Sequence, residues 1–133
     1  MIEKLDHIGI AVKDLDQAMK LYREAFGIEP SLVYESAYTK AKIAFFTVGE
    51  SRIELIQPTN PESVMAKFLE KRGEGIHHVS LKVKDVDASL GALEAKGIGL
   101  IDKKARKVRD NEKVAFLSPK STNGVLMELI EEG

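Results

Sequence analysis

The side chains best able to do chemistry are two histidines and two glutamates that occupy equivalent places in the chain. His7 and His78 open two similar stretches of sequence, and Glu54 and Glu128 lie near the ends of two others. Two neutral imidazoles and two carboxylates suit a divalent transition metal, and they leave two of about six octahedral positions open for a substrate. These residues therefore predict a metal site for Co, Mn, Ni, Fe or Zn.

The equivalence of these residues rests on an internal repeat. Residues 7–16 and 78–87 align at an offset of 71, with five of the ten positions identical. Two shorter matches follow, of 43–45 with 114–116 and, three residues further out of step, of 54–56 with 128–130. Further matches in the same order are not expected by chance, so the chain is two copies of one module. The three extra residues fit a turn insertion at 118–124.

Each module is predicted to contain a strand, a helix and three strands, which makes the fold α+β with two tandem βαβββ modules. Alternating apolar residues indicate strands, and apolar residues at helical spacing after Asp14 indicate a helix that the second module repeats. The predicted elements are 4–12, 14–26, 31–37, 40–48 and 51–57 in the first module and 76–83, 86–96, 99–106, 112–118 and 124–130 in the second. We expect a single domain, 1–133, with module one at 1–57, a linking helical segment at 58–74 and module two at 75–133.

The alternation of side chains along each strand places the four candidate ligands on the side opposite the aliphatic residues. His7, Glu54, His78 and Glu128 each alternate with aliphatic residues that are expected to pack on the helices, whereas His77 faces with the aliphatic residues. Burying a carboxylate within an apolar strand is unfavourable unless a cation or hydrogen bonds compensate it. The aliphatic neighbours are Ile8, Ile10 and Val12, Ile53 and Leu55, Val79, Leu81 and Val83, and Met127 and Leu129.

Composition excludes several other classes of protein. The 133 residues have a formal net charge of −1, which gives no overall basic excess for nucleic acid or an anionic membrane. The absence of cysteine excludes a disulfide scaffold, a thiolate zinc site and a cysteine nucleophile. With no targeting segment and no long apolar run, we expect a cytoplasmic protein with no nucleic-acid or membrane partner.

These residues resemble the vicinal oxygen chelate (glyoxalase/bleomycin resistance/dioxygenase) superfamily, in which paired modules carry a histidine on the first strand and a glutamate on the last. The resemblance covers essentially the whole chain and implies a glyoxalase-like curved mixed sheet around a metal site. Within the superfamily, several segments are similar to the methylmalonyl-CoA epimerase family. Those segments are 6–12, 52–55, 61–72, 73–78, 115–120 and 124–129.

This resemblance implies an isomerase that removes and returns the C2 proton of methylmalonyl-CoA through a metal-stabilised enolate. It implies an acyl-CoA substrate, and Glu128 as both a metal ligand and a proton carrier. Epimerases commonly place a second glutamate before the third strand, where this chain has Tyr38; Glu35 is the predicted substitute. The superfamily also implies a homodimer.

Three alternatives remain at the level of sequence. A lactoylglutathione lyase does related chemistry on the same metal, a non-catalytic binder keeps the same fold, and an extradiol dioxygenase uses a smaller ligand set. The cations at 103–109 fit either a contact for CoA phosphates or a solvated strand edge, and we favour the edge. These cations are Lys103, Lys104, Arg106, Lys107 and Arg109.

Overall fold

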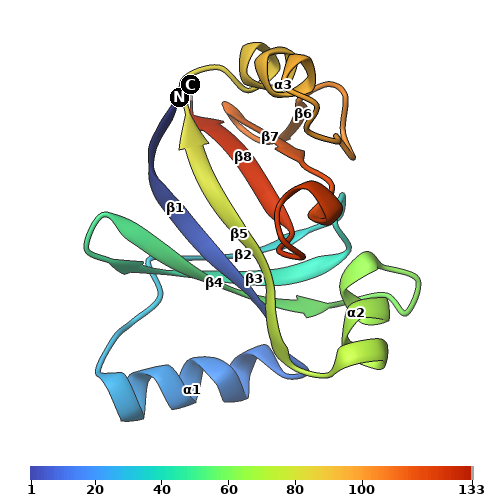
Figure 1. The fold of residues 1–133 in the computed structure, drawn as a ribbon. Coiled ribbons are helices and arrows are strands. Elements are labelled where there is room, and N and C mark those ends of the chain that lie inside the picture. The colour runs from blue at the N-terminus through green and yellow to red at the C-terminus, as the bar shows by residue number, and fades with distance from the viewer. Residues whose placement is uncertain (133) are drawn as a thin grey trace. The chain divides into compact units, whose positions relative to one another are not determined.

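The computed structural model describes residues 1–132 and divides into two compact units (Figure 1). Unit 2 is Ile8–His77, and unit 1 holds residues 1–7 together with the described chain from His78 onward. The chain passes between the units within β1 and again within β5. The elements are β1 Ile2–Ala11, α1 Leu15–Phe26, β2 Leu32–Ser36, β3 Ala41–Val48, β4 Ser51–Pro58, α2 Val64–Arg72, β5 Gly75–Val83, α3 Val86–Ala95, β6 Arg106–Arg109, β7 Glu112–Phe116, the 3₁₀ helix Pro119–Ser121 and β8 Met127–Glu132.

Unit 2 contains antiparallel strands with a different apolar cluster on each face. Its hydrogen-bonded strand order is β2-β3-β4-β1, with Phe45 opposite Glu54 in the β3–β4 pair. One face packs against α1, where Leu15 and Met19 meet Ala44, Phe46 and Leu55. The other face holds Ala11, Ala41, Ile43, Phe45 and Ile56 with Met65 of α2.

Helix α1 begins and ends where the sequence predicts. The Asp14 carboxylate accepts a hydrogen bond from Gln17 N at 3.0 Å, and Gly27 ends the helix with a φ of 67°. An oxygen side chain at the start satisfies an orphan N–H, and glycine adopts a left-handed conformation without a Cβ penalty. On the helix's inner side, burial raises the pKa of Tyr22, whose ring packs 5.0 Å from that of Phe46.

Unit 1 repeats this plan with strand order β1-β5-β8-β7-β6. Strands β5 and β8 are parallel, whereas β8 and β7 are antiparallel. Val86 and Leu90 of α3 pack on one face of the sheet, against Val83, Ala115, Leu117 and Leu129, and all six residues are buried. His78, Ser80 and Glu128 alternate with those residues and occupy the other face, as their strand phase predicts.

The predicted strand at 99–106 is wrong; β6 is instead Arg106–Arg109. Side chains and a shared carbonyl take the backbone hydrogen bonds that a regular strand would use. Ile101 N and Asp102 N both donate to Phe116 O, and the Asp102 carboxylate accepts from Phe116 N at 2.8 Å. Asp87 accepts from Ala105 N, also at 2.8 Å. The segment therefore crosses the end of β7 as irregular backbone.

The predicted turn insertion is confirmed by the 3₁₀ helix Pro119–Ser121 and the turn that follows it. Asn123 and Gly124 have φ values of 61° and 83°, which reverse the chain before β8. At the equivalent place unit 2 has only the tight turn between β3 and β4. Across residues 1–132, no helix combines the length and the apolar character needed to cross a membrane.

Candidate metal centre

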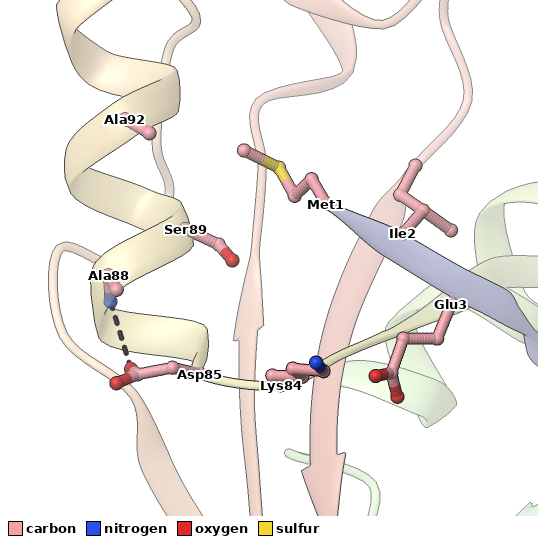
Figure 2. A pocket seen from close by; sticks show the side chains of 8 residues that line it. All are labelled: Met1, Ile2, Glu3, Lys84, Asp85, Ala88, Ser89 and Ala92. Carbon is pink, nitrogen blue, oxygen red and sulfur yellow. Dashed lines mark hydrogen bonds between the residues drawn. The ribbon is translucent and has the colours of Figure 1, made fainter.

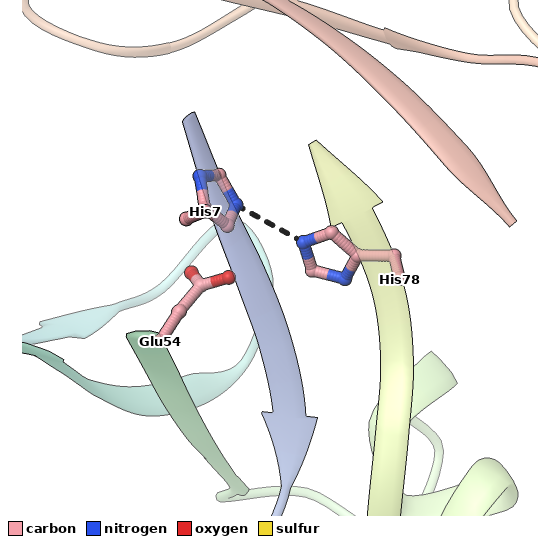
Figure 3. A group of neighbouring side chains, drawn as sticks. All are labelled: His7, Glu54 and His78. Carbon is pink, nitrogen blue, oxygen red and sulfur yellow. Dashed lines mark hydrogen bonds between the residues drawn. The ribbon is translucent and has the colours of Figure 1, made fainter. Parts of the chain in front are cut away.

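Two buried histidines of unit 1 face each other across neighbouring strands. His7 is on β1 and His78 on β5, and their Nε2 atoms are 3.1 Å apart (Figure 3). The rings meet edge to face, with centroids 5.2 Å apart. Two imidazoles share a hydrogen bond only when one nitrogen is protonated and the other offers a lone pair. A metal ion can replace that proton and bind both nitrogens.

Glu128 of β8 brings a carboxylate to the same point. Its Oε1 lies 3.4 Å from His7 Nε2 and 3.9 Å from His78 Nε2. Donor atoms about 2.1 Å from one ion lie about 3.0 Å apart at right angles and about 3.4 Å apart at the tetrahedral angle. The separations of 3.1 and 3.4 Å fit two ligands of one divalent ion, whereas the 3.9 Å between His78 Nε2 and Glu128 Oε1 is about 0.5 Å longer than the tetrahedral value.

Asp6 orients the first histidine, a role that sequence reasoning missed. Its carboxylate is 1% exposed and lies 2.7 Å from His7 Nδ1. The close carboxylate keeps the proton on Nδ1, which leaves the Nε2 lone pair directed at His78 and Glu128. Carboxylate partners of this kind fix the tautomer of metal-binding histidines. The pair of adjacent residues, aspartate then histidine, was the available signal.

Glu54 is the predicted ligand that belongs to unit 2. It lies on β4, is 7% exposed, and faces away from α1. Phe45, its partner across the β3–β4 pair, belongs to the apolar cluster on that face. The phase predicted for Glu54 is therefore confirmed, and a carboxylate among these residues needs compensation.

The comparisons with known proteins identify the superfamily of this chain. Residues 6–116 match the glyoxalase/bleomycin resistance protein/dioxygenase superfamily. The chain belongs to this superfamily. The resemblance predicted from the sequence motifs is confirmed, as is the glyoxalase-like fold.

Within the superfamily, several of the similar proteins are named as epimerases. An ethylmalonyl-CoA/methylmalonyl-CoA epimerase of Cereibacter sphaeroides is 36% identical over 97% of this chain and 98% of its own. The crystal structure of a methylmalonyl-CoA epimerase from Mycobacterium tuberculosis is 36% identical, with a TM-score of 0.92 over 99% of this chain and 89% of its own. A methylmalonyl-CoA epimerase in complex with methylmalonyl-CoA and NH₄⁺ is 32% identical, with a TM-score of 0.93 over 100% and 96% of the chains.

The glutamate predicted as a second base lies on a different face of unit 2. On β2, Tyr34 packs against the cluster that contains Phe45, so Glu35 points to the opposite face and is exposed. Its Cα partner is Lys42 of β3. Tyr38, predicted to stand where the epimerases commonly have a glutamate, lies in the turn before β3 and is 60% exposed.

The basic segment places Arg106 on the ligand-bearing face of unit 1. The Arg106 guanidinium lies 5.7 Å from the centre of the Phe116 ring and donates to Asp102 at 3.2 Å. Phe116 in turn meets the His78 ring edge to face at 5.7 Å. Lys103, Lys104 and Lys107 are exposed, as expected of a solvated strand edge.

A shallow pocket of about 580 Å³ lies elsewhere in unit 1, between the start of β1 and the first turns of α3 (Figure 2). Glu3 and Lys84 give it opposite charges, and Ser89 points toward it from α3 (Figure 2). None of the predicted site residues is among those that line it. The lining residues are Met1, Ile2, Glu3, Lys84, Asp85, Ala88, Ser89 and Ala92.

Proposed function

We propose that this protein is a metal-dependent epimerase of methylmalonyl-CoA. The observation that carries the proposal is the convergence of His7 Nε2, His78 Nε2 and Glu128 Oε1 within 3.9 Å of one another. The relatives named as methylmalonyl-CoA epimerases, one of them in complex with that substrate, support the choice of reaction.

The proposed ligands are His7, His78 and Glu128 of unit 1 with Glu54 of unit 2. Glu54 is included because the internal repeat makes it the counterpart of Glu128, and because a buried carboxylate is unfavourable unless a cation or hydrogen bonds compensate it. When bound, a divalent ion supplies a positive charge for the oxygens of a substrate that carries both a thioester and a carboxylate. The donor set suits Co, Mn, Ni, Fe or Zn.

Glu128 is the proposed proton carrier. Its carboxylate takes the C2 proton from one face of the substrate, and a second group returns a proton to the other face of the planar carbanion. The C2–H bond breaks and an equivalent bond forms on the opposite face, so the reaction needs no oxidant or co-substrate. Burial of Glu128, at 7% exposure, limits the access of bulk water to the transferred proton.

Sequence reasoning predicted Glu35 as the second group. Its position on β2, exposed and on the α1 side of unit 2, is separated by the sheet from the face that carries Glu54. An isotope experiment tests whether Glu35 acts as the second group, because a two-base epimerase exchanges hydrogen differently when each base is removed.

Exchange of the C2 hydrogen in deuterated water tests the function. We expect the Co²⁺-loaded protein to incorporate deuterium at C2 of methylmalonyl-CoA and to interconvert the two C2 epimers. Glu128→Gln should lower both rates at least about 100-fold, since general acid–base groups contribute about 10²- to 10⁴-fold. An exposed matched variant, Glu132→Gln, should react like the wild type.

A protein that binds Co²⁺ but exchanges no hydrogen of methylmalonyl-CoA would contradict the proposal. Turnover of the methylglyoxal–glutathione hemithioacetal by the same sample would instead identify a lactoylglutathione lyase. Binding of a CoA ester without exchange would identify a non-catalytic binder.

A further inference from the structure

A serine hydroxyl is buried without a partner beside the proposed ligands of unit 1. Ser80 of β5 is 0% exposed, and within residues 1–132 its Oγ has no hydrogen-bond partner. Buried polar atoms nearly always have a partner, and the exceptions mark strain, function or a missing ion or water. The Ser80 hydroxyl therefore needs a chemical explanation.

The position of Ser80 limits what that explanation can be. It lies two residues after His78 on the same strand, so the two side chains share a face. In the parallel β5–β8 pair its Cα partner is Glu128. Paired residues on strands about 4.8 Å apart have side chains that can touch, and a glutamate is long enough to bring its carboxylate toward a neighbouring hydroxyl.

Glu128 is also the group whose contacts a bound ion would change. Its Oε1 is directed toward the two imidazoles, and an ion between these three donors would fix the carboxylate there. A carboxylate has two oxygens and accepts several hydrogen bonds, so one oxygen remains available to a donor. A hydrogen bond from Ser80 would satisfy the orphan hydroxyl and restrict rotation of the carboxylate.

We propose that Ser80 is a positioning residue whose hydroxyl donates a hydrogen bond to the Glu128 carboxylate when that carboxylate binds the metal. The inference rests on the proposed metal site. The proposed hydrogen bond also distinguishes Glu128 from Glu54. The internal repeat places Gly9, which has no side chain to donate, at the position that corresponds to Ser80. Only Glu128, the proposed proton carrier, then receives support from a hydroxyl at this repeat position.

Metal affinity measures this role directly. Loss of a hydrogen-bond partner behind a metal ligand typically lowers metal affinity or activity about 10- to 100-fold. We expect Ser80→Ala to raise the Co²⁺ dissociation constant at least about tenfold by calorimetry, with a changed visible spectrum of the bound Co²⁺. Ser80→Thr, which keeps the hydroxyl, should stay within about threefold of the wild type. Ser89→Ala, which changes another buried serine, on α3, should bind Co²⁺ like the wild type.

The metal-free proteins supply the second measurement. Because Ser80 has no partner without the ion, alanine there removes an unsatisfied hydroxyl, and we expect the metal-free Ser80→Ala protein to melt no lower than the wild type. Weak Co²⁺ binding together with undiminished stability separates positioning from a folding defect.

Two results would overturn the proposal. One is a Ser80→Ala protein with an unchanged Co²⁺ affinity and spectrum; the other is a Ser80→Thr protein that folds normally but loses as much affinity as Ser80→Ala. Both use Co²⁺ alone, without substrate. Failure of the epimerase function, by contrast, is a wild-type protein that binds Co²⁺ and exchanges no C2 hydrogen, so the two failures are distinguishable.

Discussion

Asp6 and Ser80, which support the proposed ligands His7 and Glu128, differ in how far they could be predicted from the sequence. Strand phase and the repeat pointed to His7 and Glu128 because alternation has a period of two. The same rule turns Asp6 away from His7, since successive side chains point to opposite faces. The structure nevertheless has the Asp6 carboxylate 2.7 Å from His7 Nδ1, a contact that depends on local backbone geometry. Apart from its phase with His78, nothing in the sequence indicates a role for Ser80.

Removal of the Asp6 carboxylate should weaken metal binding by its effect on His7. In Asp6→Asn, the amide no longer holds the proton on Nδ1 as a carboxylate does, so the Nε2 lone pair is less available. We expect the dissociation constant of Zn²⁺ or Co²⁺ to rise about 10- to 100-fold by competition with a chelator. Asp16→Asn, an exposed change on α1, is the control. Equal metal affinity in both variants would show that Asp6 does not orient His7.

The exposed position of Glu35 leads to a second prediction at this scale. We expect Glu35→Gln to epimerise methylmalonyl-CoA within about twofold of the wild type, because its side chain and the ligand-bearing face of β4 are on different sides of the sheet. Epimerisation is followed by polarimetry or circular dichroism, and exchange by mass spectrometry. A variant that exchanges the C2 hydrogen of one epimer but no longer interconverts the two epimers would establish Glu35 as the second base.

At the scale of elements, the repeat predicted helices more accurately than strand ends. Asp14 and Asp85 each accept from the N–H three residues on, at 3.0 Å, as a capping aspartate should. The strand predicted at 99–106 failed because long-range acceptors decide its hydrogen bonds: the Asp102 carboxylate accepts from Phe116 N. Apolar alternation carries no information about such side chains, so the register of β6 could not be derived from it.

The duplicated helices share a second capping device. Gln57 Oε1 accepts from Leu15 N and Glu131 Oε1 from Val86 N, both at 2.8 Å, at equivalent positions in the two modules. Each bond satisfies an N–H at the first residue of a helix.

Loss of this device should destabilise the protein measurably. We expect Glu131→Ala to lower the free energy of unfolding by about 1–2 kcal/mol in urea titrations, the usual effect of losing a helix N-terminal acceptor. Glu131→Gln keeps an acceptor and should lose less. The control is Glu132→Ala, whose carboxylate is 43% exposed and makes a 3.9 Å ion pair with Lys82, since such surface pairs contribute little. Equal losses in Glu131→Ala and Glu132→Ala would contradict the capping role.

At the scale of the whole molecule, the organisation predicted from the sequence was a single domain of two modules. The two compact units do not coincide with the two modules, because the first residues of β1, up to His7, belong to unit 1. The chain leaves unit 1 after His7 and returns to it at His78. Both crossing points fall beside a proposed ligand. The arrangement of modules, the homodimer and the cytoplasmic location remain predictions.

A metal held by ligands from both units should stabilise both together. At about 100 times its dissociation constant, a ligand that binds only the native state adds about 2.7 kcal/mol of stability. We therefore expect saturating Co²⁺ to slow exchange of the most protected amides about 100-fold, in β4 of unit 2 as well as in β5 and β8 of unit 1. Hydrogen exchange with mass spectrometry, with and without a chelator, measures this.

In Glu54→Ala, Co²⁺ should slow amide exchange less than in the wild type throughout the protein, and least of all in β4. Glu50→Ala, an exposed change in the β3–β4 turn, should behave like the wild type. Wild-type protection confined to β5 and β8 would remove Glu54 from the ligand set and leave the metal to His7, His78 and Glu128.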